Sequence, residues 1–468
     1  MQMKKKWFYK FIGDKAFYSK VLMVAVPIMI QNGITNFVGL LDNIMVGRIG
    51  TEQMSGVAIV NQLMMVFNIS IFGAISGAGI FGAQFYGRGD HKGVRDTFRF
   101  KIYACLLILL TGILLLSFRG EELIMLYLQG EGTAESLAST LYYGKKYLAV
   151  MLLGLPAFCI DQYYASTLRE CGETVLPMKS GITAVLINLV LNAILIFGLF
   201  GAPALGVVGA AVATVVSRYV QMAITVVWTH KHKERMRFVE GAYKSFKIPT
   251  ALTWKIMLKG APLMINEILW SVGMAILMQC YSVRGLDVIA AMNISSTISN
   301  LFNVVFLAMG SALAIMVGQH LGAGRLEEAR DVDNKLIAFD LISCVVMGGL
   351  MILCAPLFPR LYNTTADVKE LATSFMRVAA ACMPLHGFMH AAYFTLRSGG
   401  KTMITFLFDS GFVWCLNIPV AYVLSRYTGV PIVPLYLICQ LVEIVKCSVG
   451  FVLVRKGVWI NNLVADSE

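Results

Sequence analysis

Long apolar runs recur along this chain and restrict its fold more than any other feature. A bilayer core of about 30 Å requires roughly 20 apolar residues per helix, because lipid offers no partner to a free backbone N–H or C=O group. A transmembrane β-barrel would instead show segments of about ten residues with alternating polarity. The sequence therefore predicts an all-α membrane protein with twelve transmembrane helices. The runs cover residues 21–46, 54–81, 102–118, 141–164, 177–200, 206–229, 256–281, 288–317, 336–356, 373–396, 402–424 and 432–454.

The net charge of +12 is explained by how the chain crosses the membrane, because the lysines and arginines gather in particular connections between the apolar runs. Most of the 39 lysines and arginines precede the first run, lie in or beside the even-numbered connections, or lie near the end of the chain. Positively charged connections stay on the cytoplasmic side of a membrane, so we expect both termini in the cytoplasm and the chain in the inner membrane. No nucleic-acid partner is expected. Residues 1–20, which open with the stretch Lys4–Lys10, are predicted to form a basic-aromatic cytoplasmic segment at the bilayer surface.

The chain is internally duplicated. At one constant spacing Pro27 and Gln31 match Pro262 and Asn266. The same spacing brings Gln84, Gly87, Gly89, Arg95 and Asp96 onto Gln319, Gly322, Gly324, Arg330 and Asp331. Six helices per copy is an even number, so both copies start on the same side of the membrane. We predict two pseudo-symmetric six-helix lobes, 21–229 and 256–454, joined by a cytoplasmic linker, 230–255, and followed by a cytoplasmic tail, 455–468.

Several motifs in a fixed order resemble the MATE (multidrug and toxic compound extrusion) transporters, with features between the NorM-like and DinF-like branches. They are Met45–Gly50, Gln84–Gly89, Thr167–Thr174 and Gly206–Ala211. The resemblance spans residues 20–455. It implies outward export of small, amphipathic organic cations by a monomer in the lipid bilayer, driven by inward movement of H⁺ or Na⁺. No cofactor is implied besides this coupling ion.

Acidic residues inside the predicted helices need a reason, because a carboxylate at the bilayer centre costs at least about 2.5–3.5 kcal/mol. Asp42 is the first of them. Gln31 and Thr35 share its helical face, and Asn36 lies beside it. We expect Asp42 to bind H⁺ or Na⁺ in exchange for a substrate cation, with the other three side chains lining the substrate path. A structural hydrogen bond to a neighbouring helix is the alternative.

A pair of asparagines, Asn188 and Asn192, lies one turn apart in the run 177–200. Their carbonyl oxygens could ligate sodium, and simple packing between helices is equally compatible. The resemblance places Asn192 beside Asp42, at a position that is commonly Asp in the DinF-like branch. This chain therefore lacks a second titratable group there.

Glu267 lies in the run 256–281 with Met274, Met278 and Tyr281 on its helical face. One acid among thioether and aromatic side chains suits an amphipathic organic cation through charge and cation–π contact. We expect Glu267, like Asp42, to bind H⁺ or Na⁺ in exchange for the substrate cation. The resemblance supports a functional role, because several MATE branches carry an acid here. A methionine-rich packing stripe around a neutral, hydrogen-bonded glutamate is the alternative.

Two histidines, His386 and His390, lie one turn apart in the run 373–396. We predict His386 as a proton-titrating group near Glu267, and Tyr393 as part of the substrate cavity. No metal site is expected, because two histidines without further ligands do not complete one.

The other four acids inside predicted helices are interpreted as structural: Asp161, Asp340, Asp409 and Glu443. Glu443 is expected to pair with Lys446, three residues further along the same helix.

No motif of an enzyme or an ATP-driven machine occurs. GxxxxGK[ST], HExxH and GxSxG are all absent from the sequence. The sequence therefore predicts a secondary antiporter that exports small organic cations in exchange for H⁺ or Na⁺. A flippase for a lipid-linked anionic precursor is the alternative. It would require arginines in the cavity, and only Arg218 lies well inside a predicted helix.

Overall fold

The computed structural model describes residues 11–128, 133–362 and 364–465, and at residues 40, 43, 44 and 286 the backbone alone. Within these ranges all regular secondary structure is helical. The predicted basic-aromatic stretch at residues 1–10 and the last three residues of the predicted tail lie outside them.

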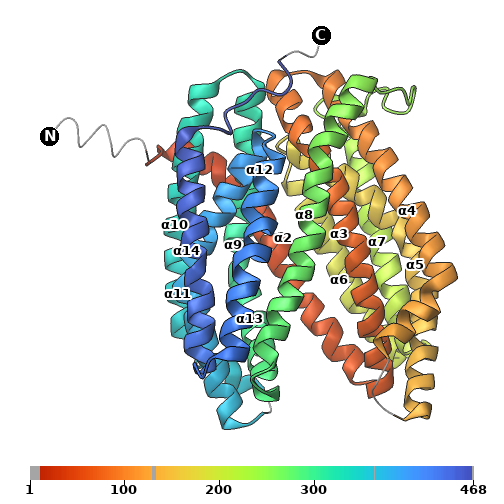
Figure 1. Cartoon of the computed structure of the whole chain (residues 1–468). Coiled ribbons are helices and arrows are strands. Elements are labelled where there is room, and N and C mark those ends of the chain that lie inside the picture. The colour runs from red at the N-terminus through yellow and green to blue at the C-terminus, as the bar shows by residue number, and fades with distance from the viewer. Residues whose placement is uncertain (1–10, 129–132, 363, 466–468) are drawn as a thin grey trace. The chain divides into compact units, whose positions relative to one another are not determined.

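The described residues form twelve long helices (Figure 1). They are α2 (Lys15–Gly47), α3 (Thr51–Arg88), α4 (His91–Tyr127), α5 (Ala134–Glu170), α6 (Val175–Phe197), α7 (Val207–Lys231), α8 (Thr250–Ser282), α9 (Leu286–Gly322), α10 (Leu326–Cys354), α11 (Ala366–Ser398), the continuous run α12 (Thr402–Phe406) to α13 (Ile418–Tyr427), and α14 (Ile432–Lys456). Eleven are long and apolar enough to cross a membrane. The exception is α11, whose centre contains Pro384, His386 and His390. The predicted all-α membrane fold is confirmed.

Several helices are longer than the apolar runs that predicted them. Helix α3 continues to Arg88 rather than ending at 81, α4 begins at His91 rather than 102, and α5 continues to Glu170 rather than 164. A helix keeps its backbone hydrogen bonds when it leaves the hydrocarbon, so apolar length underestimates helix length. Residues that appear to lie in polar connections, Lys101 among them, are therefore helical.

The chain divides into two compact units whose boundary does not follow the sequence repeat. We call Ile30–Gly82 with His91–Trp254 the N-unit. The C-unit comprises the described chain up to Met29, Ala83–Asp90, and the chain from Lys255 onward. The first turns of α2 and the last turns of α3 thus belong to the C-unit.

Close helix packing and a buried ion pair between Lys101 and Glu170 stabilise the N-unit. Helix α5 packs against α4 and α7, and α6 packs against α7. The Lys101 ammonium lies 2.6 and 2.7 Å from the two carboxylate oxygens of Glu170, and it also donates to Thr167 Oγ1 at 3.0 Å. Gly79 and Gly82 of α3 leave the space that Glu170 fills, because a Cβ atom on either would collide with its carboxylate.

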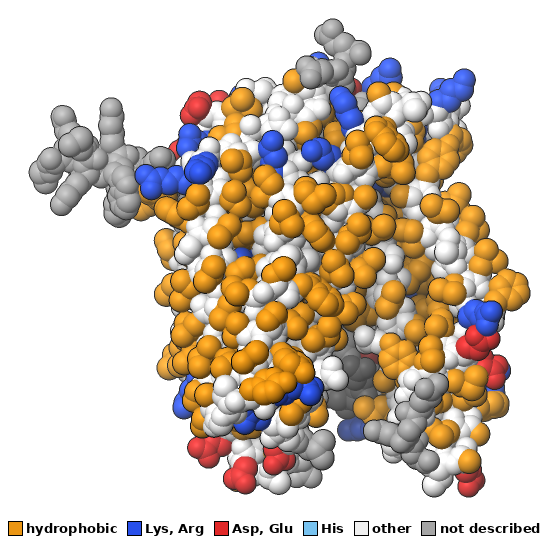
Figure 2. Space-filling view, in the orientation of Figure 1, with side chains coloured by type: hydrophobic (Ala, Val, Ile, Leu, Met, Phe, Trp, Pro, Cys, Tyr) orange, Lys and Arg blue, Asp and Glu red, His pale blue; other side chains and the backbone are white. Residues whose placement is uncertain are grey.

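In the C-unit, α9, α10 and α11 pack against one another and α14 packs against α11 (Figure 1). The core of this unit includes Val21 and Ala25 of α2 and also Trp459, which follows α14. On the face shown in Figure 2, apolar side chains cover the helices between their ends. Leu441, Val445 and Phe451 of α14 are 43%, 52% and 53% exposed. An exposed apolar surface of this extent fits contact with lipid.

Two repeat-related glycines mark a close helix crossing inside the C-unit. A Cβ atom on Gly87 of α3 would lie 2.6 Å from the Cα of Gln319, and one on Gly322 of α9 would lie 2.5 Å from the Cα of Gln84. The Gln84 side chain donates to the Ser398 carbonyl at 2.9 Å and accepts from the Leu463 amide at 2.8 Å. The segment after α14 is therefore fastened to the ends of α3 and α11.

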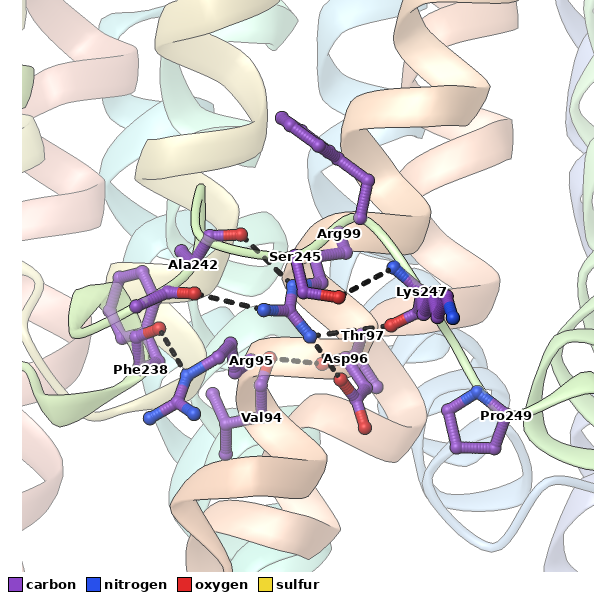
Figure 3. Close-up of polar contacts among 12 residues, drawn as sticks. Val94, Arg95, Asp96, Thr97, Arg99, Phe238, Ala242, Ser245, Lys247 and Pro249 are labelled. Carbon is purple, nitrogen blue, oxygen red and sulfur yellow. Dashed lines mark hydrogen bonds and ion pairs between the residues drawn. The ribbon is translucent and has the colours of Figure 1, made fainter.

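The connection between α7 and α8 is folded onto α4 rather than extended. Arg99 donates through Nε to the Ala242 carbonyl at 3.0 Å and through Nη2 to the Gly241 carbonyl at 2.9 Å (Figure 3). Its Nη1 atom donates to Asp96 Oδ1 at 3.0 Å. Much of the predicted linker is thus a structured part of the N-unit.

Removing this arginine should release the connection. Each hydrogen bond to a charged group contributes about 1.5–3 kcal/mol, so Arg99→Ala should favour local opening by about 1.5–3 kcal/mol and increase tryptic cleavage after Lys244 and Lys247 about 10- to 100-fold. Arg119→Ala, which removes an exposed ion pair with Glu122, is the control. Cleavage of Arg99→Ala at the wild-type rate would contradict the role given to Arg99.

Candidate functional site

Asp42 is part of a polar cluster inside the N-unit. Its Oδ1 atom accepts a hydrogen bond from Asn192 Nδ2 at 2.7 Å, and the same Nδ2 lies 3.1 Å from Asn188 Oδ1. Asn188 in turn contacts Thr214 Oγ1 at 3.2 Å. Three helices, α2, α6 and α7, contribute to the cluster.

The local sequence explains how these helices come together. Asn188 and Asn192 are one turn apart and therefore lie on the same face of α6. Helix α7 approaches this helix closely because Gly209 has no side chain, and a Cβ atom there would lie 2.5 Å from the Leu195 carbonyl oxygen. Thr214 is thereby brought within reach of Asn188.

The amides of the cluster leave one oxygen unused. Turned by half a rotation, the Asn188 amide places its nitrogen 3.1 and 3.0 Å from the two oxygens of Asp42 and its oxygen 3.2 Å from the Thr214 backbone nitrogen. Asn192 Oδ1 is buried and has no hydrogen-bond partner within the described part of the chain. A buried acceptor without a donor is costly, so this oxygen is available to bind a donor or a cation.

The other residues predicted on α2 are separated from this cluster. Gln31 accepts a hydrogen bond from Arg169 Nη2 at 3.0 Å. Thr35 and Asn36 are exposed. Their predicted role in binding substrate stays a prediction.

Glu267 lies inside the C-unit, where its Oε1 atom accepts a hydrogen bond from the Tyr393 hydroxyl at 3.3 Å. Two of the predicted site residues are in contact in this way. Met274 is 45% exposed and Met278 is half-buried. Tyr281 is buried in the core, edge-on to Tyr436 with ring centroids 5.7 Å apart.

The two histidines of α11 have other partners. His386 Nε2 lies 2.9 Å from Gln440 Oε1, and the His390 ring packs edge-on against Phe306 at 5.0 Å. No hydrogen bond or ion pair joins either of them to Glu267 among the residues that the structure describes. His386 was predicted to titrate near Glu267, and no direct contact between the two supports this role, which stays a prediction. Within those residues no group of three potential metal ligands occurs.

The prediction that Glu443 forms an ion pair with Lys446 is wrong. Lys446 Nζ lies 2.7 Å from Asp409 Oδ1, and Glu443 Oε1 accepts a hydrogen bond from Asn417. The spacing of three residues allows Glu443 and Lys446 to approach each other along α14. Lys446 points instead toward Asp409 in the α12–α13 run. A lysine in the middle of the apolar run 432–454 could have indicated a buried partner on another helix.

Of the other acids interpreted as structural, Asp161 accepts hydrogen bonds from Thr225 and Gln221, both at 2.8 Å. Asp340 Oδ1 is contacted by the Cys344 thiol at 3.7 Å. Sequence reasoning also missed Thr214, the partner of Asn188, and Asn266, the partner of Asp409. Asn266 donates to Asp409 Oδ2 at 3.0 Å. Its match with Gln31 in the repeat was the available signal.

The doubled set of membrane helices with acids inside both units defines a membrane transporter. The family model MatE matches residues 27–194 and 262–423, one segment in each half, and the chain belongs to this family of transporters. It is accordingly not an enzyme.

Curated relatives match most of the chain. It is 27% identical over 417 residues to the probable multidrug resistance protein NorM of Thermotoga maritima, covering 87% of this chain and 86% of the relative. It is 25% identical over 421 residues to the multidrug resistance protein PmpM of Pseudomonas aeruginosa, covering 88% of this chain and 84% of the relative.

Solved structures show the same fold. The outward-facing structure of a multidrug resistance MATE family transporter of the MOP superfamily has a TM-score of 0.85 with this chain. The two are 20% identical, and the match covers 96% of this chain and 97% of the other. A point mutant of the Vibrio cholerae MATE transporter VcmN matches with a TM-score of 0.84 at 18% identity, over 96% and 98% of the chains. The two-lobed helical architecture of these transporters is thus that of the present chain.

Proposed function

We propose that this chain is a secondary antiporter that exports small organic cations in exchange for H⁺ or Na⁺. The observation that carries the proposal is the Asp42 cluster. A carboxylate inside the N-unit accepts a hydrogen bond from the Asn192 amide, whose own buried oxygen has no hydrogen-bond partner among the described residues. The names of the relatives, which are multidrug resistance proteins, support drug-like substrates for this chain as well.

The negative charge of the Asp42 carboxylate is what would allow one cation to be exchanged for another at this cluster. Among the described residues, Asp42 has amide partners and no ion pair, whereas Glu170 in the same unit is neutralised by Lys101. An ionised carboxylate in a membrane helix is stabilised when one positive charge joins it. H⁺, Na⁺ and an organic cation each supply one such charge, so they compete for Asp42.

The two coupling ions would need different groups. Na⁺ would need neutral oxygens in addition to the Asp42 carboxylate, and we infer that Asn192 Oδ1 and the Thr214 hydroxyl supply them. A proton requires the carboxylate alone. Loss of the Asn192 oxygen in Asn192→Leu should therefore impair sodium coupling much more than proton coupling.

The C-unit contributes Glu267 to this proposal. Its contact with Tyr393 joins an acid to an aromatic ring, the combination that binds organic cations through charge and cation–π contact. We infer that Glu267 and Tyr393 bind the substrate or a second coupling ion. We also infer a monomer in the inner membrane with both termini in the cytoplasm, as the distribution of lysine and arginine favours.

Ethidium efflux from proteoliposomes under an imposed proton or sodium gradient tests the proposal. Asp42→Asn should reduce gradient-driven efflux to the rate of protein-free liposomes. The control Asp367→Asn, which changes an exposed acid in the first turn of α11, should retain the wild-type rate. Glu267→Gln, measured alongside, assigns the role of the second acid.

Efflux by Asp42→Asn at the wild-type rate would disprove the role of Asp42. If the wild type shows no efflux under either gradient, the antiport proposal fails and a lipid-precursor flippase becomes the better hypothesis.

A further inference from the structure

The C-unit contains a buried ion pair that joins two helices of the second repeat. Lys446 of α14 and Asp409 have side chains 8% and 17% exposed, with Nζ and Oδ1 2.7 Å apart. The ammonium also lies over the rings of Phe408 and Phe412, at 5.3 and 5.8 Å from their centroids. The positive charge is therefore held by one carboxylate and two aromatic faces.

Both oxygens of Asp409 are engaged. Oδ1 contacts Lys446, and Oδ2 accepts from Asn266 Nδ2 of α8 at 3.0 Å. Asn266 is itself fixed, because its Oδ1 atom accepts from the Ser410 amide at 3.2 Å and from the Ser410 hydroxyl at 2.7 Å. Asp409 lies in a π-helical stretch, Leu407–Gly411, between α12 and α13. π-helical turns of this kind commonly occur at functional sites.

The three helices of this cluster are the counterparts of those around Asp42. Within the repeat, α8 corresponds to α2, the α12–α13 run to α6, and α14 to α7. In the N-unit the first of these helices carries the carboxylate and the second carries the amides. In the C-unit the order is reversed, with Asn266 on the first helix and Asp409 on the second. The correspondence is between helices and not between positions, because Asn266 matches Gln31 in the repeat. The third helix contributes the hydroxyl of Thr214 in the N-unit and the ammonium of Lys446 in the C-unit.

We propose that Lys446 is a built-in cation that permanently occupies the carboxylate site formed by Asp409 and Asn266 in the C-unit. Asp409 then takes no part in exchange with a free ion, and Glu267 remains the acid of the C-unit that is open to exchange. The inference rests on the proposed function for its comparison with Asp42. The claim that an ammonium holds the place of a free monovalent cation can be tested separately.

The prediction is that removal of Lys446 creates a sodium site. To exclude any contribution of Asp42 and Glu267, all variants carry Asp42→Asn and Glu267→Gln. The apparent Tm of the purified full chain is measured in NaCl and in choline chloride at equal ionic strength. In this background Lys446→Met should raise the Tm in NaCl over choline chloride by about 3–5 °C, because ligand binding to the folded state alone stabilises it. The double variant Asp42→Asn with Glu267→Gln should show no such difference.

The matched control adds Asp409→Asn to Lys446→Met. The sodium effect should disappear, since the free carboxylate is gone. Lys446→Gln, which keeps a hydrogen-bond donor for Asp409, is measured in the same way in case the methionine variant does not fold.

Equal Tm values in NaCl and choline chloride for the Lys446 variants would overturn the inference. So would failure of both variants to fold when NaCl is present throughout purification. Neither readout depends on transport, so the proposed antiport can fail while this inference survives, and the reverse.

Discussion

Lys101→Met is expected to destabilise the protein by about 3–5 kcal/mol, because it leaves the carboxylate of Glu170 buried without its counter-charge. The lysine side chain is completely buried, and its ammonium contacts both oxygens of Glu170 as well as the Ser166 and Thr167 hydroxyls. Methionine fills a similar volume, so the lost charge rather than a cavity should dominate. The apparent Tm of the purified protein should fall by about 5 °C or more.

Lys145→Met is the matched control. Lys145 forms an ion pair of similar length with Glu121, at 2.5 Å, but the two side chains are 50% and 48% exposed. Exposed pairs contribute about 0–1 kcal/mol, so this substitution should change the Tm little. The double variant Lys101→Met with Glu170→Leu should recover much of the loss, because replacing a whole buried pair by apolar groups is often neutral. Equal Tm losses for the Lys101 and Lys145 variants would contradict this account.

The position of the helices could be predicted from the sequence because the physical rule is simple. Lipid-facing backbone must be helical, and apolar length then locates each span. The rule fails at helix ends, where polar turns continue the helix, and Lys101 was placed in a connection for this reason. Helix α11 was predicted from the run 373–396 although histidines replace apolar residues at its centre.

The site was predicted less completely, because its contacts depend on how each helix is rotated about its axis. Spacing grouped Asn188 with Asn192, while the family resemblance placed Asn192 near Asp42. Lys446 was assigned to Glu443 because both follow the 3.6-residue period of one helix. Its actual partner, Asp409, lies in a π-helical stretch, where that period does not hold. No pattern within one helix reveals such a pairing.

The crossing of α3 and α9 shows what an internal repeat adds. Gln84 and Gly87 recur in the second copy as Gln319 and Gly322. The sequence therefore indicated that both copies need these residue types, but it did not show why. In the structure each glycine faces the backbone of the partner helix at the position of the other copy's glutamine. The requirement is therefore steric, and it applies equally to both glycines.

Gly87→Ala and Gly322→Ala should each destabilise the C-unit by about 1–3 kcal/mol, and leucine at either position by more. A Cβ atom at either site would fall within 2.6 Å of a backbone Cα, so the helices must separate. Separation would also strain the hydrogen bonds from Gln84 to Ser398 and Leu463. The apparent Tm of the purified protein reports the loss.

Gly349→Ala provides the opposite expectation within the same unit. Gly349 lies in α10, and a Cβ atom there has no neighbour within 4 Å. Alanine loses less backbone entropy than glycine on entering a helix, so this change should be neutral or stabilising by up to about 1 kcal/mol. If Gly87→Ala matched Gly349→Ala in Tm, the close backbone crossing would not be the reason for the repeated glycine.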